Sequence, residues 1–123
     1  MNAASILVSV VDDDDSVRES LPDLLRELGF ASEVFAAPGD LLQSPNIEKV
    51  DCLILDISMP GMSGTELRRE LVNRGHDIPT IFITAHPAFA LRSDVREGAA
   101  DCLIKPFSEA ALFEALKRAL NLD

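Results

Sequence analysis

The sequence predicts an α/β domain in which five helices cover a doubly wound, parallel sheet of five strands. Five short runs rich in Val, Ile and Leu alternate along the chain with segments that have the apolar spacing of amphipathic helices. The runs are almost continuously apolar, as expected of parallel strands that are buried on both faces. A chain of 123 residues is the size of a single domain with a core of its own.

The composition excludes several other classes. With 47% hydrophobic and 26% charged residues, the chain is typical of a soluble globular protein. Its net charge of −10 repels phosphate backbones, so we expect this domain not to bind nucleic acid itself. No apolar run approaches the roughly 20 residues of a membrane helix, and no basic region precedes the first apolar run, which predicts a cytoplasmic location. Cys52 and Cys102 lack zinc spacing and are expected to be buried thiols.

The first half of the chain is predicted to form a strand, a helix, a second strand and a short helix, at residues 6–11, 16–29, 32–35 and 38–43. Ser16 and Glu19 have the spacing of a capping box, which predicts that the first helix begins at Ser16. Apolar residues then recur at helical spacing until Gly29. Pro22 lies inside this helix and is expected to remove one backbone hydrogen bond and to kink it.

The second half is predicted to continue the alternation, with strands at 52–56, 78–84 and 102–104 and helices at 63–75, 87–98 and 108–120. Ser63 begins a second capping box. Pro87 suits the first turn of a single helix whose apolar residues include Phe89, Leu91 and Val95. Right-handed crossovers between these strands would place all of their carboxyl ends at one edge of the sheet.

Polar side chains stand at four of these carboxyl ends. Asp12 and Asp13 follow the first strand, and Asp56 ends the third. Thr84 ends the fourth strand, and Lys105 follows the fifth. Ligands of open α/β sheets bind at this edge, so the sequence predicts one site there made of three carboxylates, a hydroxyl and an ammonium group.

This set of groups predicts phosphoryl chemistry assisted by Mg²⁺. Clustered carboxylates raise one another's pKa values unless a divalent cation takes up their charge, and Mg²⁺ prefers a few carboxylates together with phosphate oxygens. Asp56 is the predicted nucleophile, and the product would be an aspartyl phosphate. Taken alone, Asp56, Thr84 and Lys105 each have an ordinary structural explanation, and we assign Asp14 and Asp15 to a helix N-terminus.

The motifs at these strand ends resemble those of receiver domains in two-component response regulators, and most closely the FixJ/NarL-like receivers that precede helix-turn-helix domains. The resemblance covers residues 5 to 120 and rests on Val11-Asp12-Asp13, on Asp56 with Met59-Pro60 and Gly64, on Ile83-Thr84-Ala85 and on Lys105-Pro106-Phe107. It implies the flavodoxin-like strand order 2-1-3-4-5. It also implies a cis peptide bond between Lys105 and Pro106.

The resemblance implies a role for each site residue. Asp56 would accept a phosphoryl group from the phosphohistidine of a sensor histidine kinase. Mg²⁺ would be bound by Asp12, Asp13 and Asp56 together with the backbone carbonyl of Ser58. Thr84 and Lys105 would bind the phosphoryl oxygens, and Thr84 would begin the conformational switch that follows phosphorylation.

The resemblance is incomplete at Cys102, where the family usually has an aromatic ring that turns inward after phosphorylation. The output is expected to be dimerisation or control of an effector through helix 4, strand 5 and helix 5, with transcription as the effector's function. No effector domain is expected within residues 1–123, which would form one receiver domain, either stand-alone or part of a longer protein. Two alternatives stay open: a receiver that binds a partner independently of phosphate, and a Mg²⁺-dependent phosphohydrolase. Ser58 disfavours the second, because those enzymes typically have another Asp there.

Overall fold

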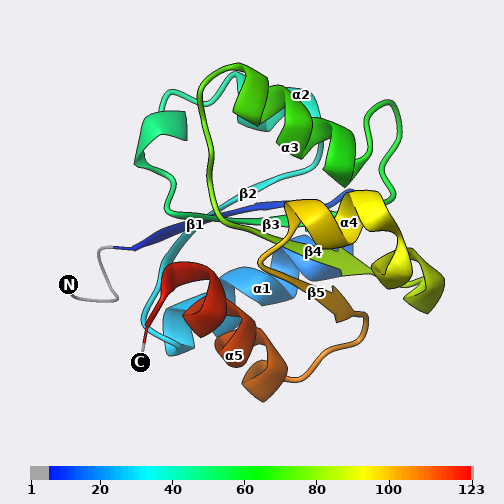
Figure 1. The fold of residues 1–123 in the computed structure, drawn as a ribbon. Helices are drawn as coiled ribbons and strands as arrows, with labels where there is room; N and C mark the ends of the chain where they lie inside the picture. Colours follow the sequence, from blue (N-terminus) through cyan, green and yellow to red (C-terminus); the bar gives the residue numbers. More distant parts are fainter. Residues whose placement is uncertain (1–5, 123) are drawn as a thin grey trace.

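The computed structural model describes residues 6–122 and contains a five-stranded parallel sheet in the order β2-β1-β3-β4-β5, with helices on both faces (Figure 1). This confirms the predicted fold class and strand order. Residues 1–5 and residue 123 lie outside the described part. The prediction that no basic region precedes the first apolar run concerns residues 1–5 and therefore lies outside it too. Among residues 6–122, no helix has the length and apolar character needed to span a membrane.

The strands are β1 (Leu7–Val11), β2 (Ala31–Phe35), β3 (Cys52–Asp56), β4 (Thr80–Thr84) and β5 (Asp101–Ile104). The helices are α1 (Asp15–Glu27), α2 (Pro38–Leu42), α3 (Gly64–Asn73), α4 (Ser93–Gly98) and α5 (Glu109–Leu120), with 3₁₀ turns η2 (Ile47–Lys49) and η3 (Pro87–Leu91). All neighbouring strands are parallel, and their register pairs Asp56 with Ile83 and Thr84 with Ile104. The carboxyl ends of the central strands therefore meet at one edge.

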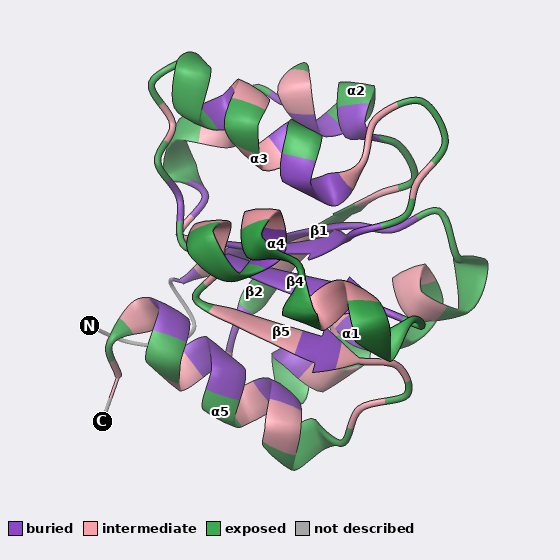
Figure 2. Cartoon of the chain, turned by 45° about the vertical axis from the view of Figure 1, so that its right-hand side comes forward, coloured by how far each residue is buried: buried purple, intermediate pink, exposed green. Residues whose placement is uncertain are grey.

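The core has two layers, one on each face of the sheet. The side chains of Val8, Val10 and Ile54 pack with α1 and α5, whereas those of Val11, Leu53 and Leu55 pack with α2, α3 and α4. The central strands β1, β3 and β4 are mostly purple in Figure 2 because both of their faces are covered. Cys52 is fully buried in β3, as predicted. Cys102 is only partly buried, so the prediction of a second buried thiol is wrong. It lies in edge strand β5, which has a neighbour on one side only.

The first helix begins earlier than predicted, and its cap is different. Asp14 is the N-cap residue: its Oδ1 accepts the backbone N–H of Ser16 at 2.9 Å, and α1 starts at Asp15. The capping box predicted at Ser16 is therefore wrong, because Asp14 caps the helix instead and accepts the N–H of Ser16 itself. The assignment of Asp14 and Asp15 to the helix N-terminus is confirmed. The helix continues through Pro22 to Glu27.

The capping box predicted for α3 is confirmed. The Ser63 hydroxyl accepts the Glu66 N–H at 3.2 Å, and the Glu66 carboxylate accepts the Ser63 N–H at 3.0 Å. This double cap fixes the start of α3 directly after the loop that follows Asp56. The helix ends at a turn in which Gly75 has a φ of 89°, a conformation that favours glycine.

The single helix predicted at 87–98 is wrong, since the segment divides into η3 and α4 at Arg92, whose backbone is extended. Arg92 donates to the Asp94 carboxylate from both Nε and Nη2, at 3.1 and 2.6 Å, and lies 5.3 Å from the centre of the Phe89 ring. These contacts stabilise a break where helical spacing alone predicts continuity. As a result, Val95 is fully buried while Leu91 is 75% exposed, so these two apolar residues do not lie on one buried helix face.

Candidate functional site

Three carboxylates gather at the carboxyl edge of the sheet. Asp12 follows β1, Asp56 ends the neighbouring β3, and the ligand oxygens of these two residues and Asp13 all lie within 4.8 Å of one another. Asp12 is completely buried and Asp56 is 6% exposed, whereas Asp13 is exposed. The structure thus brings together the three predicted carboxylates in a pocket that is open to solvent at Asp13.

Lys105 provides the positive charge beside these carboxylates. Its Nζ lies 2.8 Å from Asp12 Oδ2 and 3.6 Å from Asp56 Oδ2, and its side chain is 17% exposed. The predicted cis bond between Lys105 and Pro106 is confirmed. Asp12 Oδ2 is buried and has no hydrogen bond of good geometry, so its contact with Lys105 is an ion pair rather than an aligned hydrogen bond. The ammonium group of Lys105 thus contacts two of the three clustered carboxylates.

Burial and mutual repulsion shift the titration of this pocket. Burial, followed by the neighbouring Asp12 carboxylate, raises the pKa of Asp56 to about 7, although Lys105 and the Ser58 N–H act in the opposite direction. Burial by itself would lower the pKa of Lys105, but the Asp12 and Asp56 carboxylates outweigh this and raise it. The pocket therefore holds more negative charge than its own ammonium group offsets.

The residues of the pocket fit a hard divalent cation. Carboxylate oxygens are the ligands that Mg²⁺ prefers, and the buried Asp12 Oδ2 accepts no hydrogen bond. A cation among these oxygens would also remove the repulsion that raises the pKa of Asp56. The carboxylate cluster is consistent with a metal site, while the predicted contribution of the Ser58 carbonyl stays a prediction.

Thr84 lies at the same edge, but its hydroxyl contacts the next loop rather than the carboxylates. Its Oγ1 accepts the backbone N–H of His86 at 3.0 Å, and the side chain is fully buried. The Lys105 N–H donates to the Thr84 carbonyl at 2.8 Å, which joins the ends of β4 and β5. The structure places Thr84 beside Lys105 as predicted and binds its hydroxyl to the start of η3.

Gly64 and Arg18 shape the site without belonging to the predicted set of ligands. A Cβ atom at Gly64 would lie 2.3 Å from the backbone oxygen of Asp56, so only glycine lets α3 begin against the end of β3. Arg18 donates from Nη1 to the backbone carbonyl of Asp12 at 2.8 Å. Sequence reasoning placed Gly64 in a family motif but could not show that this close contact requires glycine. It missed Arg18, although Asp15 and Arg18 stand three residues apart in a predicted helix.

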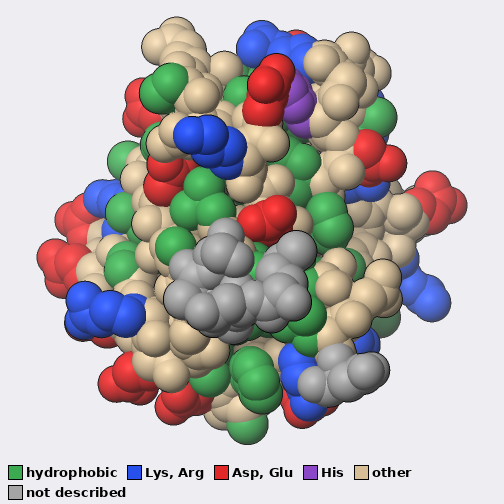
Figure 3. All heavy atoms as spheres, turned by 90° about the vertical axis from the view of Figure 1, so that its left-hand side faces the viewer, with side chains coloured by type: hydrophobic (Ala, Val, Ile, Leu, Met, Phe, Trp, Pro, Cys, Tyr) green, Lys and Arg blue, Asp and Glu red, His purple; other side chains and the backbone are tan. Residues whose placement is uncertain are grey.

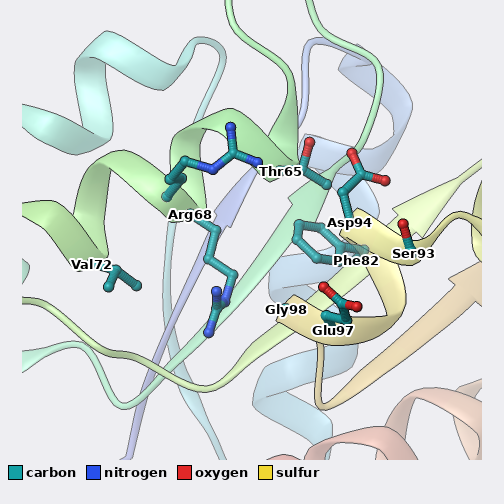
Figure 4. A pocket seen from close by; sticks show the side chains of 9 residues that line it. Thr65, Arg68, Val72, Phe82, Ser93, Asp94, Glu97 and Gly98 are labelled. Carbon is teal, nitrogen blue, oxygen red and sulfur yellow. The ribbon is translucent and has the colours of Figure 1, made fainter.

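Two hollows lie near the edge. One of about 590 Å³ lies between α1 and the loop after β5, next to Lys105, and is lined by apolar side chains that include Leu24 and Phe107. A second, of about 290 Å³, lies between α3 and α4, over the ring of Phe82 (Figure 4). Its walls carry Arg68 on one side and Glu97 on the other, and it contains none of the clustered carboxylates. The first hollow borders the site, whereas the second separates α3 from α4.

The family model described as the response regulator receiver domain matches residues 8–117. This chain belongs to that family. The receiver domain is 37% identical over 123 residues to the response regulator protein TodT of Pseudomonas putida, covering 99% of this chain and 54% of that protein. It is 39% identical over 118 residues to the transcriptional regulatory protein FixJ of Azorhizobium caulinodans, covering 95% of this chain and 56% of that protein.

Solved structures agree with this membership. The receiver domain matches a low-resolution structure of the response regulator StyR with a TM-score of 0.87 and 44% identity, over 96% of this chain and 60% of that one. It matches the response regulator TrrA from Thermotoga maritima, solved in complex with Mg(2+)-BeF, with a TM-score of 0.83 and 30% identity, over 94% of this chain and 99% of that one. The chain is a phosphoacceptor signalling module of a type found in transcriptional response regulators.

The receiver domain spans about half the length of the curated relatives that it matches. Those relatives therefore contain a second part of similar size that has no counterpart in these residues. The family implies a histidine kinase as a partner, without identifying which one.

Proposed function

We propose that Asp56 accepts a phosphoryl group from the phosphohistidine of a sensor histidine kinase, in a reaction that depends on Mg²⁺. The observation that carries this proposal is the position of Asp56: it ends β3 within 4.8 Å of two further carboxylates and 3.6 Å from the Lys105 ammonium group. No ordinary turn aspartate needs such surroundings. The membership in the receiver family supports the same role.

In the proposed step, an Asp56 carboxylate oxygen forms a bond to phosphorus while the bond between phosphorus and the histidine nitrogen breaks. The bonding electrons stay on the imidazole, which takes up a proton. Lys105 would stabilise the negative charge that spreads over the phosphoryl oxygens in the transition state. Because protonated Asp56 is a poor nucleophile, positive charge beside it also favours the reactive carboxylate.

The residues proposed to bind Mg²⁺ are Asp12, Asp13 and Asp56, with the backbone carbonyl of Ser58. When bound, the cation would neutralise phosphoryl oxygens and offset the repulsion among the carboxylates. The solved complex of TrrA with Mg(2+)-BeF supports the choice of metal. Asp12 would keep its ion pair with Lys105, which lies 2.8 Å away, and so link the metal site to the phosphoryl site.

Thr84 is proposed as the first element of the switch. Its hydroxyl accepts the His86 N–H, and binding a phosphoryl oxygen would require the hydroxyl to turn away from η3. That movement would release the segment before α4 and alter the face of α4, β5 and α5. Cys102 lies on this face and takes the place of the usual aromatic ring, so it is the residue through which coupling would differ. Dimerisation on phosphorylation is the proposed result.

The hollow beside Lys105 is proposed as the docking surface for the kinase. It measures about 590 Å³ and opens between α1 and the loop after β5. Apolar side chains of Val17, Leu24 and Phe107 line it, and a helix that carries the phosphohistidine would bury them while presenting its imidazole to Asp56. The apolar lining next to an acidic pocket supports a protein partner.

The wider biological role follows from the relatives and is proposed as such. Residues 1–123 would form one receiver domain of a cytoplasmic regulator, and a second part like that of the longer relatives would act in transcription. The net charge of −10 disfavours DNA binding by this domain itself. On the face shown in Figure 3, Lys and Arg side chains are interspersed with Asp and Glu side chains.

Labelling by a small acyl phosphate tests the proposal. We expect Mg²⁺-dependent labelling of the wild-type protein, and loss of labelling in Asp56→Asn and on chelation of the metal. Asp14→Asn is the matched control, because it removes a nearby exposed carboxylate while Asn still caps α1. Undiminished labelling of Asp56→Asn would contradict the proposed phosphoacceptor.

A further inference from the structure

The side chain of Arg18 turns back from α1 onto the loop between β1 and α1. Its Nη1 donates to the backbone carbonyl of Asp12 at 2.8 Å, and its Nη2 pairs with the carboxylate of Asp15. The side chain is 22% exposed, unlike that of Arg26 in the same helix, which is 80% exposed. Arg18 is thus packed against the acidic loop. Arg26 lies in the same helix with an exposed side chain and can serve as a control for Arg18.

This contact fixes one of the two peptide groups that flank Asp13. The carbonyl of Asp12 belongs to the peptide before Asp13, and Arg18 is its donor. The N–H of Asp14 belongs to the peptide after Asp13, and it donates to Asp12 Oδ1 at 2.9 Å. The backbone on both sides of Asp13 is therefore held by hydrogen bonds, one from Arg18 of α1 and one to the Asp12 carboxylate of the site. These two bonds orient the exposed side chain of Asp13.

We infer that Arg18 is a positioning residue for the cation site, an inference that rests on the proposed Mg²⁺ chemistry. Its hydrogen bond holds the loop in the conformation that places Asp13 within 4.8 Å of Asp12 and Asp56. Without this bond, the Asp12 carbonyl needs a water molecule as its donor, and the loop gains other conformations in which Asp13 leaves the cluster. Partners of this kind, which orient a metal ligand without touching the metal, strongly affect metal affinity.

The positive charge of Arg18 should change the affinity for Mg²⁺ in the opposite direction from its hydrogen bond. A positive charge beside a cation site weakens cation binding. Asp15 pairs with the guanidinium and offsets much of this charge, whereas no second donor in the described residues contacts the Asp12 carbonyl. If the charge governs the effect, Arg18→Met binds Mg²⁺ more tightly than the wild type. If the hydrogen bond governs it, the variant binds Mg²⁺ more weakly.

The experiment measures the dissociation constant of Mg²⁺ by calorimetry for the wild type, Arg18→Met, Arg18→Lys and the matched control Arg26→Met. We expect Arg18→Met to bind Mg²⁺ about tenfold more weakly, and Arg18→Lys, which keeps a donor, to lose less. Arg26→Met should match the wild type, because Asp23, itself exposed, is the one acidic partner of Arg26 within residues 6–122. Circular dichroism verifies that each variant is folded. Equal or tighter binding by folded Arg18→Met overturns the inference.

A second readout separates positioning from general damage. Acyl-phosphate labelling of Arg18→Met should reach the wild-type rate at saturating Mg²⁺, while the Mg²⁺ concentration for half of that rate should rise about tenfold. A rate that stays low at saturating Mg²⁺ also overturns the inference. If the wild type is labelled in a Mg²⁺-dependent way and Arg18→Met is unchanged, only this inference fails. Wild-type protein that neither binds Mg²⁺ nor is labelled would instead contradict the proposed function.

Discussion

The carboxylate pocket and the α4 region lie at the ends of neighbouring strands, yet they are constrained very differently. In the pocket, Asp12 has a partner for each of its polar groups: its N–H donates to Phe35, its carbonyl accepts from Arg18, and its two carboxylate oxygens contact the Asp14 N–H and Lys105. In the α4 region, hollows of about 290 and 330 Å³ lie on the two sides of the short helix, and Leu91 is 75% exposed.

This difference assigns separate tasks to the two regions. Groups that transfer a phosphoryl group must be in place before the reaction, and rigid strand ends provide that placement. An element that moves after the reaction must have a second arrangement of similar free energy, which loose packing permits. The Thr84 hydroxyl connects the two regions, because it lies at the edge of the sheet and contacts η3.

The largest expected effect comes from filling the tight contact beneath the pocket. Gly64→Ala places a Cβ atom 2.3 Å from the Asp56 backbone oxygen, and neither backbone segment can give way easily. We expect the free energy of unfolding to fall by about 3 kcal/mol or more, together with loss of labelling, since Asp56 must shift. Urea denaturation measures the first and acyl-phosphate labelling the second.

Gly39→Ala is the control for this substitution. A Cβ atom at Gly39 meets no atom within 4 Å, and the residue lies inside α2. The change is therefore expected to be neutral or to stabilise the protein by up to about 1 kcal/mol, because alanine favours the helix. Equal destabilisation by the two substitutions would show that the α3 contact does not constrain the site.

The same contrast explains which features the sequence could predict. The strands, their shared edge and the pocket residues follow from apolar runs that end in polar side chains, and this pattern is strong where both faces are buried. The break at Arg92 depends on contacts with Phe89 and Asp94, which helical spacing does not encode. The roles of Arg18 and Gly64 require coordinates, because each acts on the backbone of a strand end. The roles of Thr84 and Ser58 came from the family resemblance, whereas Asp56 was predicted as the nucleophile from the groups at the sheet edge.

A smaller effect is expected from the charge of the pocket. The pKa of Asp56 is about 7 in the folded protein and close to 3.8 in the unfolded chain, so the folded state binds more protons between these values. In the absence of Mg²⁺, the free energy of unfolding should therefore fall by a few kcal/mol from this group as the pH rises from about 4 towards 8. Urea denaturation across this pH range measures the slope.

Asp56→Asn isolates the contribution of this carboxyl group. The variant should lose this part of the pH dependence and should be more stable than the metal-free wild type above neutral pH, because no buried charge forms. Added Mg²⁺ should stabilise the wild type more than the variant. An unchanged slope in Asp56→Asn would show that other groups cause the pH dependence.

The smallest effects are expected from substitution of the two cysteines, one in the central sheet and one beside the α4 region. Cys52 is fully buried in central β3, and burial, followed by Asp51, raises its pKa to about 12. Cys102 is partly buried beside the hollow of about 330 Å³, and burial and then Asp101 raise its pKa as well. We expect Cys102→Ala to change the free energy of unfolding by less than about 1 kcal/mol, and Cys52→Ala to destabilise by more.

Thiol labelling of the folded protein measures how differently Cys52 and Cys102 are protected. Cys102 should react at least about 100-fold faster than Cys52, which reacts only after local or global opening of the sheet. Mg²⁺ with beryllofluoride, as a phosphoryl mimic, should alter the rate at Cys102 in the wild type and leave it unchanged in Asp56→Asn. Equal rates at the two thiols would mean that β5 is as well protected as β3. If the labelling rate of Cys102 does not change when Mg²⁺ and beryllofluoride are added, the response of the α4 region does not reach β5.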